Sequence, residues 1–296
     1  KALESVTGLG NVESRRGSLL TDQWTNTQRV FPMIHPARLT RLDKARQRKD
    51  EMKKINQFTA AMLLDMQKLR HILKEDIWKP PYRQLITWKN CKVLSVFMQE
   101  LKRFEQSTTL AFDIETYKGT ITAISFADSP DRAVSIPFCG QFSTDEEFRL
   151  IKAIARVLDA PSWKIAHNGA YDITYLATAP GWKIPVRNMW LDTMLLHHVL
   201  HIELPHTLEF VCSQYTLQPY YKNMRKEADS TAYSGTAWEY NALDSCITWA
   251  ASRPMFDEAV RRGLWQFYMT YTVKLMSVLM RMQLRGVYID QTVMAE

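Results

Sequence analysis

Two carboxylates inside an apolar segment constrain this chain more than any other feature. Residues 110–116 read Leu-Ala-Phe-Asp-Ile-Glu-Thr, which is typical of a buried strand in which Asp113 and Glu115 carry the only charges. Because side chains two residues apart on a strand point to the same face, the two carboxylates project together. They repel each other there, and a hard divalent cation between them would offset the repulsion. Taken alone, so short a pair is more often part of a solvated edge strand, so the rest of the chain must be considered.

Composition favours a folded chain and excludes several classes of protein. The 296 residues are 46% hydrophobic and 11% aromatic, which is enough for one large or two modest domains. No apolar run approaches the roughly 18 residues of a membrane span, so we expect no membrane partner. The chain begins at Lys1 without an initiator methionine, which indicates a fragment or a processed piece. Its four cysteines lack C-x-x-C spacing, so we expect reduced thiols and neither a zinc nor an iron–sulfur site.

Charge is distributed unevenly along the chain. Residues 1–112 carry 21 Lys+Arg and 11 Asp+Glu (+10), whereas residues 113–296 carry 17 and 20 (−3), which together give the net charge of +7. The basic half indicates a polyanion partner such as nucleic acid, and the acidic half is suited to a cation. The densest basic stretch, residues 38–54, contains Arg38 and Arg41, our candidate nucleic-acid contacts outside the acidic half. A charge run of this kind is more often a solvated helix face.

An amphipathic helix follows the basic stretch. Apolar residues recur at spacings of three and four from Met52 to Leu73, which predicts a helix of about 25 to 30 residues. The sequence Trp-Lys-Pro-Pro at residues 78–81 ends this helix, and we place a domain boundary after residue 80. A short strand is expected just before His35, and a short helix over residues 95–104.

Three apolar segments at close spacing predict an antiparallel meander. They cover residues 110–116, 121–127 and 133–138, and short turns with Gly or Ser-Pro-Asp separate them. Further elements are expected in this order: a helix opened by a capping box at Thr144, a strand at 163–167, a helix near Tyr171, helices at 191–198 and 206–215, and a helix opened by a second capping box at Thr236. The last helix carries Tyr240 and Asp244 on one face, since they are four residues apart.

Three short motifs then complete an acidic set. Asp113 and Glu115 form the first, Asp172 follows Asp113 by 59 residues after His-Asn-Gly-Ala-Tyr, and Asp244 follows 72 residues later in Tyr-Asn-Ala-Leu-Asp. Each motif alone is weak, but in this order and on these elements they resemble the DEDDy class of 3′–5′ exonucleases. The resemblance implies an α/β, ribonuclease-H-like fold. That fold has a mixed sheet with three antiparallel strands first, flanked by helices, here with a helical N-terminal extension.

The resemblance also implies two-metal-ion hydrolysis of phosphodiesters. Asp113 would bridge both ions, Glu115 and Asp244 would complete the ion on the nucleophile side, and Asp172 would hold the second ion partly through water. Tyr240 would orient the attacking water, because an unperturbed tyrosine with a pKa near roughly 10 is a poor base at neutral pH. Ligands that are all oxygen favour Mg²⁺ or Mn²⁺ over zinc.

Several other residues have weaker predicted roles. Asn168 and Thr116 are candidate contacts to the terminal nucleotide, although Asn168 is equally consistent with capping the following helix. Phe112, with Tyr171 and Trp238, is a candidate to stack on terminal bases, although most aromatic residues will belong to the core. Asp192 matches a recurrent feature of the exonuclease family, although an exposed carboxylate at a helix N-terminus is the plainer account. His167 is expected to pack or to orient rather than to catalyse, and packing and surface positions are expected for His197 and His198.

Two further resemblances extend beyond the exonuclease motifs. The helix after residue 264 and the segment Arg-Gly-Val-Tyr-Ile-Asp at residues 285–290 resemble the entry into the polymerase portion of family-A DNA polymerases. Arg16-Gly17 and residues 35–41 resemble the closing part of a uracil-DNA glycosylase-type domain. We therefore expect three domains, at residues 1–80, 81–262 and 263–296, the last a truncated start of a polymerase domain. The motifs for nucleotidyl transfer are absent, so the chain should not polymerise.

The expected function is proofreading by the exonuclease part of a family-A, phage-type DNA polymerase. Its partners would be a single-stranded DNA 3′ end or frayed primer terminus and the remainder of a polymerase chain, in the cytoplasm of a bacterial host. Two alternatives stay open, namely a stand-alone DEDDy exonuclease acting on RNA ends and a non-catalytic nucleic-acid-binding module. The catalytic motifs fit the first alternative equally well. The second would be favoured by a lost carboxylate, and none is lost.

Overall fold

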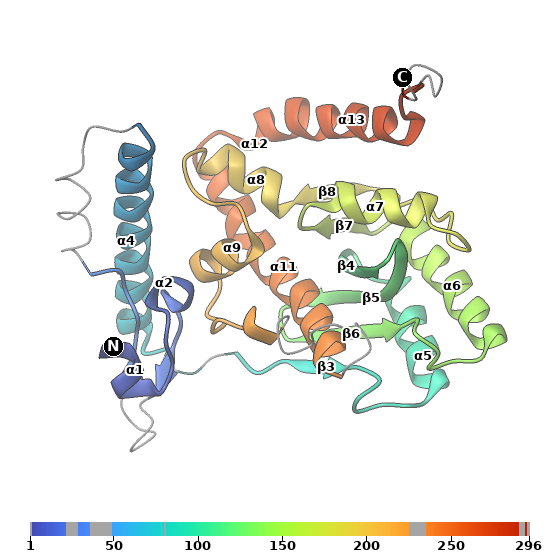
Figure 1. The fold of residues 1–296 in the computed structure, drawn as a ribbon, viewed down its shortest axis with the longest axis horizontal. Helices are drawn as coiled ribbons and strands as arrows, with labels where there is room; N and C mark the ends of the chain where they lie inside the picture. The colour runs from blue at the N-terminus through green and yellow to red at the C-terminus, as the bar shows by residue number, and fades with distance from the viewer. Residues whose placement is uncertain are drawn as a thin grey trace.

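The structure is a computed structural model, and it describes residues 2–21, 29–35, 49–77, 79, 81–224, 235–289 and 294, with the backbone alone for residues 2, 21 and 49–56. The predictions for Arg38 and Arg41 lie outside the described residues. In chain order, and as Figure 1 shows, the elements are α1 (Ala2–Thr7), α2 (Val12–Arg15), β1 (Leu20–Thr21), β2 (Arg29–Val30), α4 (Lys49–Glu75), β3 (Gln84–Ile86), α5 (Leu94–Phe104), β4 (Thr109–Tyr117), β5 (Thr120–Ser129), β6 (Arg132–Pro137), α6 (Thr144–Asp159), β7 (Trp163–Ala166), α7 (Gly169–Thr178), β8 (Met189–Asp192), α8 (Thr193–Leu200), α9 (Leu208–Tyr215), α11 (Gly235–Arg261), α12 (Trp265–Phe267), a π-helical turn (Tyr268–Thr272) and α13 (Val273–Arg285).

Six strands form one mixed sheet in the order β3-β6-β5-β4-β7-β8. The pairs β6–β5 and β5–β4 are antiparallel, whereas β3–β6, β4–β7 and β7–β8 are parallel. The turn between β4 and β5 is Lys118-Gly119, and both residues have positive φ, 48° and 83°, as a two-residue hairpin of type I′ requires. The predicted α/β fold, with three antiparallel strands first, is confirmed. The sequence did not reveal β3, a three-residue strand at the edge of the sheet.

Each strand presents one set of residues to each helical layer. On β4, Leu110, Phe112 and Ile114 pack into a core with α5, α6 and α7. Ala111 points the other way, into a second core with α8, α9 and α11. The odd-numbered face of β4, which carries Asp113 and Glu115, is therefore the face that α11 covers.

Small side chains lie where α11 crosses the sheet. Alanines at residues 111, 127 and 133 are fully buried beneath it, and Ser125 and Ser135 are buried between them. Small residues at a helix–sheet contact let the backbones approach closely. Ser125 Oγ donates to the carbonyl of Asn241 (2.8 Å), and Ser135 Oγ donates to Asn241 Oδ1 (2.7 Å), so hydrogen bonds fix the helix in register on the strands.

Three predicted element starts were wrong in detail. The capping box of α6 uses Ser143 and Glu146, one residue before the predicted pair, because the Ser143 side chain accepts from the Glu146 N–H. Leu191 and Asp192 belong to strand β8, and the helix predicted from residue 191 begins at Thr193. Thr236 lies inside α11, whose described part begins at Gly235, so it is not the cap.

An N-terminal unit of α1, α2, α4 and the β1–β2 hairpin docks on α9 (Figure 1). The 27-residue α4 confirms the predicted amphipathic helix. Arg16 Nη1 lies 2.5 Å from Asp65 Oδ1, and Arg16 Nη2 donates to Ser213 Oγ at 3.0 Å. Lys68 Nζ donates to the carbonyls of Gly17 (2.6 Å) and Ser213 (2.8 Å). Arg16, part of the glycosylase-like resemblance, is therefore a buried contact within the fold.

The segment after residue 262 is joined to the sheet domain. Tyr268 is 1% exposed in the second core, and its hydroxyl accepts a hydrogen bond from the N–H of Asp192 at 2.7 Å. Beyond it, α13 leaves a row of apolar side chains exposed, formed by Leu275, Leu279 and Met282. The three predicted domain ranges remain predictions. Among the described helices, none combines the length and the apolar character needed to cross a membrane.

We expect Gly17→Ala to lower the free energy of unfolding by about 1 to 3 kcal/mol. Gly17 has a φ of +71°, and an added Cβ would lie 2.9 Å from the carbonyl oxygen of Ser213, which cannot rotate aside. Urea unfolding followed by circular dichroism measures the loss. Gly10→Ala is the matched control, because a Cβ there meets nothing within 4 Å. Equal losses in the two variants would contradict this explanation.

Candidate active site

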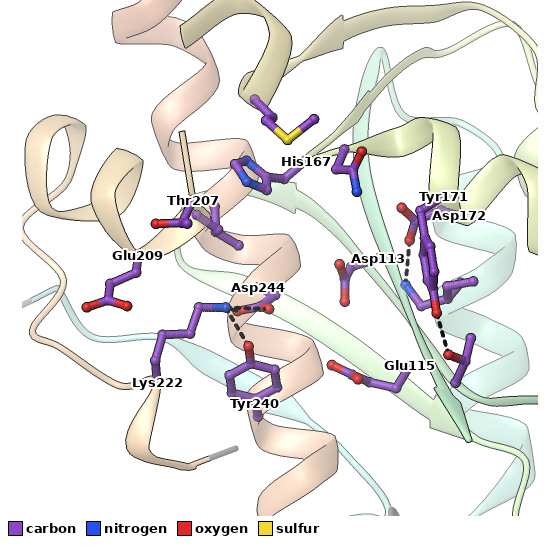
Figure 2. A pocket seen from close by; sticks show the side chains of 15 residues that line it. Asp113, Glu115, His167, Tyr171, Asp172, Thr207, Glu209, Lys222, Tyr240 and Asp244 are labelled. Carbon is purple, nitrogen blue, oxygen red and sulfur yellow. Dashed lines mark hydrogen bonds and ion pairs between the residues drawn. The ribbon is translucent and has the colours of Figure 1, made fainter. Parts of the chain in front are cut away.

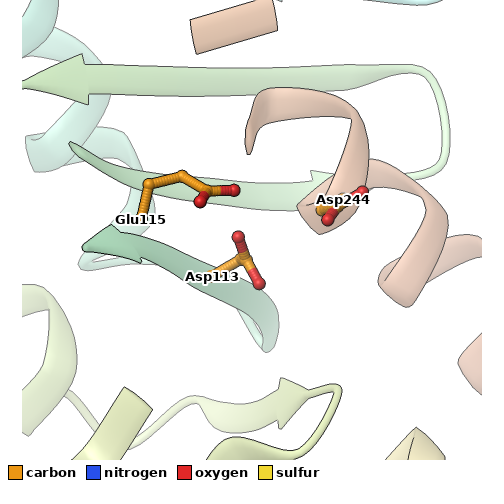
Figure 3. Close-up of side chains that lie close together, drawn as sticks. All are labelled: Asp113, Glu115 and Asp244. Atoms are coloured by element: carbon orange, nitrogen blue, oxygen red, sulfur yellow. The ribbon is translucent and has the colours of Figure 1, made fainter. Parts of the chain in front are cut away.

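Three carboxylates from one strand and one helix converge at the centre of the sheet. Asp113 and Glu115 extend from β4, and Asp244 extends from α11 toward them (Figure 3). One carboxylate oxygen of each lies within 4.8 Å of the others. An all-oxygen ligand set that is partly buried and this close fits a hard divalent cation such as Mg²⁺ or Mn²⁺. Among the described residues, this is the one group of three or more that could hold a metal ion.

Asn241 holds the carboxylate of Asp113 in place. Its Nδ2 donates to Asp113 Oδ2 at 2.8 Å, while its Oδ1 accepts from Ser135 Oγ. Asn241 is fully buried, and Ser125, opposite Asp113 on β5, binds its carbonyl. We did not single out Asn241 from the sequence, although it stands between Tyr240 and Asp244 in the third motif. Its role depends on how α11 is seated on the sheet, which no local pattern reports.

Asp172 joins the second motif to the first strand. It lies in the first turn of α7, is 3% exposed, and its Oδ1 accepts from the N–H of Ile114 at 2.9 Å. Asp172 lines the same pocket as Asp113, although it is not one of the three carboxylates that converge within 4.8 Å. Its assignment to a second metal ion therefore remains a prediction.

Asp192 organises the turn that carries the second motif. We expected an exposed carboxylate, but Asp192 is 1% exposed because β8 brings it into the interior. It caps α8 by accepting from the N–H groups of Met194 and Leu195, and it also accepts from the N–H groups of Asn168 (3.1 Å) and Gly169 (2.8 Å). Asn168 has φ 62°, and within α7 its side chain makes no capping hydrogen bond. The capping alternative for Asn168 was therefore wrong.

Electrostatic repulsion is strong in this pocket. Burial raises the pKa of Asp113 well above its usual range, and the charges of Asp172, Asp244 and Glu115 raise it further, while Lys222 opposes them. Burial also raises the pKa of Asp172 well above its usual range, against the hydrogen bond from Ile114. Unless a cation compensates, the site therefore favours retention of a proton.

Lys222 is a cation of the site that our sequence analysis missed. Its Nζ lies 2.8 Å from Asp244 Oδ2, 3.0 Å from Asp244 Oδ1 and 2.5 Å from the Tyr240 hydroxyl, as Figure 2 shows. Tyr221 donates its hydroxyl to Asp244 Oδ1 at 2.5 Å. Tyr240 is 4% exposed and shares one face of α11 with Asp244, as predicted. Lys222 lies in a turn after α9, where no periodicity pointed to it.

The carboxylates line a cavity of about 540 Å³ that other candidate residues share. Thr116, Asn168 and Tyr171 lie along its wall, and the Tyr171 hydroxyl is 2.6 Å from Thr116 Oγ1. Tyr171 is 43% exposed and therefore accessible to a base. Phe112, in contrast, is 1% exposed in the core, so its predicted nucleic-acid contact was wrong. The burial of Phe112 follows from the two-residue period of a strand, because the adjacent Phe112 and Asp113 must point to opposite faces of the sheet.

A chain of histidines borders the cavity on the α8–α9 side. His167, on the cavity wall, lies 2.8 Å from Thr193 Oγ1 through Nδ1, and burial lowers its pKa to about 3. His197 is fully buried; its Nδ1 lies 2.8 Å from His206 Nδ1 and its Nε2 lies 2.9 Å from Gln214 Oε1. A neutral imidazole satisfies both contacts, accepting at one nitrogen and donating at the other. The expected packing role of His197 and the surface position of His198 are confirmed.

A comparison with protein families gives one match. The sequence profile of a family described as 3′-5′ exonuclease, of DNA polymerase A type, matches residues 85–251. This range covers 167 of the 296 residues, more than half of the chain. It also covers the sheet from the second residue of β3 onward, and all five carboxylates that line the pocket. No curated protein matches the chain at a significant level.

Solved structures of similar fold include three nucleic-acid enzymes. The catalytic core of RRP6 from Trypanosoma brucei is 16% identical, with a TM-score of 0.51, over 67% of this chain and 54% of that one. RNase D from Escherichia coli is 17% identical, with a TM-score of 0.51, over 70% and 51%. Pol1 from M. smegmatis is 16% identical, with a TM-score of 0.52, over 66% and 31%. The chain thus spans about half of the first two and a third of the last, and the likeness establishes the shared fold.

We expect His197→Gln to make the free energy of unfolding depend less steeply on pH at acid pH. Burial lowers the pKa of His197 to about 4 from its ordinary 6.5. Below pH 6.5 the unfolded chain therefore takes up a proton that the folded protein does not. The stability that His197 contributes is fully present above pH 6.5 and is lost as the pH falls toward 4. Between pH 7.5 and 5 the variant should lose about 1 to 2 kcal/mol less than the original chain in urea unfolding. Parallel profiles for the variant and the original chain would refute the assignment.

Proposed function

Because the chain belongs to the 3′–5′ exonuclease family, we propose that it removes nucleotides from DNA 3′ ends as the proofreading part of a family-A DNA polymerase. One observation carries the proposal: Asp113, Glu115 and Asp244 converge within 4.8 Å at a cavity. Phosphodiester hydrolysis requires charge neutralisation on both sides of the phosphorus atom, and a carboxylate cluster serves it by holding divalent cations.

We propose that two Mg²⁺ or Mn²⁺ ions bind here, held by Asp113, Glu115 and Asp244 with Asp172 on the α7 side. When bound, such ions lower the pKa of water and offset charge on the phosphate and on the leaving oxygen. The all-oxygen donor set supports this choice of metal. The raised pKa of Asp113 supports it too, because a cation relieves the same repulsion that otherwise retains a proton.

The protein's own groups position the reactants. Tyr240 accepts a hydrogen bond from Lys222, an ammonium that can only donate, so the tyrosine proton points away from the lysine. We propose that this hydroxyl orients the attacking water. Thr116 and Asn168, which also line the cavity, would contact the terminal nucleotide, and Tyr171 would stack on its base.

The polymerase setting rests on two weaker supports. The matching family profile is of DNA polymerase A type, and α13 presents the exposed side chains of Leu275, Leu279 and Met282 on one side of the helix. An apolar row of this kind is typical of a surface that another element covers. We propose that the remainder of a polymerase packs there.

Action on RNA ends is the second candidate. RNase D from E. coli is described as an exoribonuclease involved in structured RNA processing, and its fold resembles this chain as closely as that of Pol1 does. The carboxylates and Tyr240 serve either polymer, since the scissile phosphodiester is the same. The choice therefore depends on contacts to the sugar.

We expect Asp113→Asn and Asp244→Asn each to reduce Mg²⁺-dependent cleavage by at least about 10³-fold, because each removes a charged ligand. The measurement uses single-stranded DNA labelled at either end, with and without EDTA. Stepwise shortening from the 3′ end should occur in the original chain and disappear in both variants. Asp145→Asn, an exposed carboxylate in the first turn of α6, should retain full activity.

Two results would contradict the proposal. Full nuclease activity in either site variant would remove these residues from the reaction. Intact DNA in every lane, with no binding of divalent metal in calorimetry, would favour a non-catalytic nucleic-acid-binding module.

We expect DNA to be shortened at least about tenfold faster than RNA of the same sequence. A site built for DNA gains nothing from a 2′-hydroxyl and must desolvate it, which costs of the order of a kcal/mol or more. Single-stranded DNA and RNA oligonucleotides of the same sequence and length are digested side by side. Equal rates or faster RNA cleavage would support the stand-alone ribonuclease instead.

A further inference from the structure

The ammonium of Lys222 lies on the oxygens that Asp244 would offer to a metal ion. Its Nζ is 2.8 Å from one Asp244 oxygen and 3.0 Å from the other, so it contacts both. Among the described residues that line the cavity, Lys222 is the one lysine or arginine, facing Asp113, Glu115, Asp172, Glu209 and Asp244. A resident positive charge thus lies among the carboxylates of the cavity.

The two residues before Lys222 are held in place by other parts of the fold. The N–H of Tyr220 donates to Ser18 Oγ at 3.0 Å, and the guanidinium of Arg15 lies 5.2 Å from the centre of the Tyr220 ring. Tyr221 is 5% exposed and donates to Asp244. The side chain of Lys222 is only 16% exposed, and its Nζ lies 4.5 Å from the Tyr240 ring centre. The contact between Lys222 and Asp244 is therefore built into the fold, unlike a surface ion pair between two mobile side chains.

We propose that Lys222 is a built-in cation of the exonuclease site, which neutralises Asp244 before metal binds, positions Tyr240, and weakens the binding of a divalent ion at Asp244. The inference rests on the proposed metal-dependent function and adds a residue that sets metal affinity. Two cations cannot both lie against the same carboxylate oxygens without repelling each other, so a metal ion must displace the ammonium or share Asp244 with it. The site would then keep its shape without metal, and it would bind a divalent ion only above a threshold concentration of that ion.

The test compares the full chain with Lys222→Met, which removes the charge and keeps an unbranched side chain of similar reach. Titration calorimetry with Mn²⁺ alone should show binding tighter by about tenfold or more, because the competing charge is gone. In EDTA the variant should melt at a lower temperature than the original chain, since the carboxylates lose their counter-ion. Addition of Mn²⁺ should then raise its melting temperature by more than it raises that of the original chain.

Three further variants make the result specific. Lys222→Gln removes the charge but keeps a hydrogen-bond donor, so it should also bind Mn²⁺ more tightly, and it replaces the Met variant if that one does not fold. Lys222→Arg keeps the charge and should bind Mn²⁺ as the original chain does. Lys89→Met is the matched control, because Lys89 Nζ lies 2.9 Å from Glu239 on the same helix α11, in a half-exposed pair outside the cavity. It should leave the affinity unchanged.

The outcomes separate this inference from the proposed function. Unchanged or weaker Mn²⁺ binding in both Lys222→Met and Lys222→Gln, with normal binding in the original chain, would overturn the role of Lys222 alone. A residue that only supports the shape of the site would give that weaker binding when replaced. No Mn²⁺ binding in the original chain or in either variant would overturn the metal-dependent function itself, and this inference with it.

Discussion

Repulsion among carboxylates is the constraint on which the rest of this structure depends. Five of them line one cavity, and bare carboxylates so placed would drive the strand and the helices apart or retain protons. The fold provides a separate donor for three of them: Asn241 for Asp113, the Ile114 N–H for Asp172 and Lys222 for Asp244. Each donor belongs to a different segment, so the site holds its shape only when the whole sheet domain is assembled.

The packing of α11 on the sheet links the carboxylate site to the core. Alanine and serine side chains beneath the helix let it lie close to β4 and β5, and Asn241 replaces apolar packing by hydrogen bonds to Ser125 and Ser135. A buried amide with all its partners present fixes one register, because a shift of the helix would leave several polar groups unpaired. The position of Asp244 opposite Asp113 follows from that register. Core packing and catalytic geometry are thus determined by the same few contacts.

Local periodicity explains how much of the site was predictable. The two-residue period of a strand placed Asp113 and Glu115 on one face, and the four-residue spacing of a helix placed Tyr240 beside Asp244. The same strand period should have assigned Phe112 to the core. Asp192 was misjudged because it ends a strand and caps a helix at once, which a pattern of either kind alone does not show. Lys222 depends on which segments meet in three dimensions, and no short pattern in a single sequence records that.

Contacts of the N-terminal unit explain part of the chain's uneven charge. A surplus of basic residues in the first 112 positions suggested contacts to a polyanion, yet Arg16 and Lys68 are directed inward, Arg16 to Asp65 and Lys68 to the carbonyl of Ser213 on α9. Through Ser18, the same unit holds the backbone next to Lys222. The N-terminal unit of the basic half therefore helps to position the segment that carries Lys222 in the acidic half. Charge along a sequence indicates a partner class only for those side chains that folding leaves exposed, and here the fold uses several of them itself.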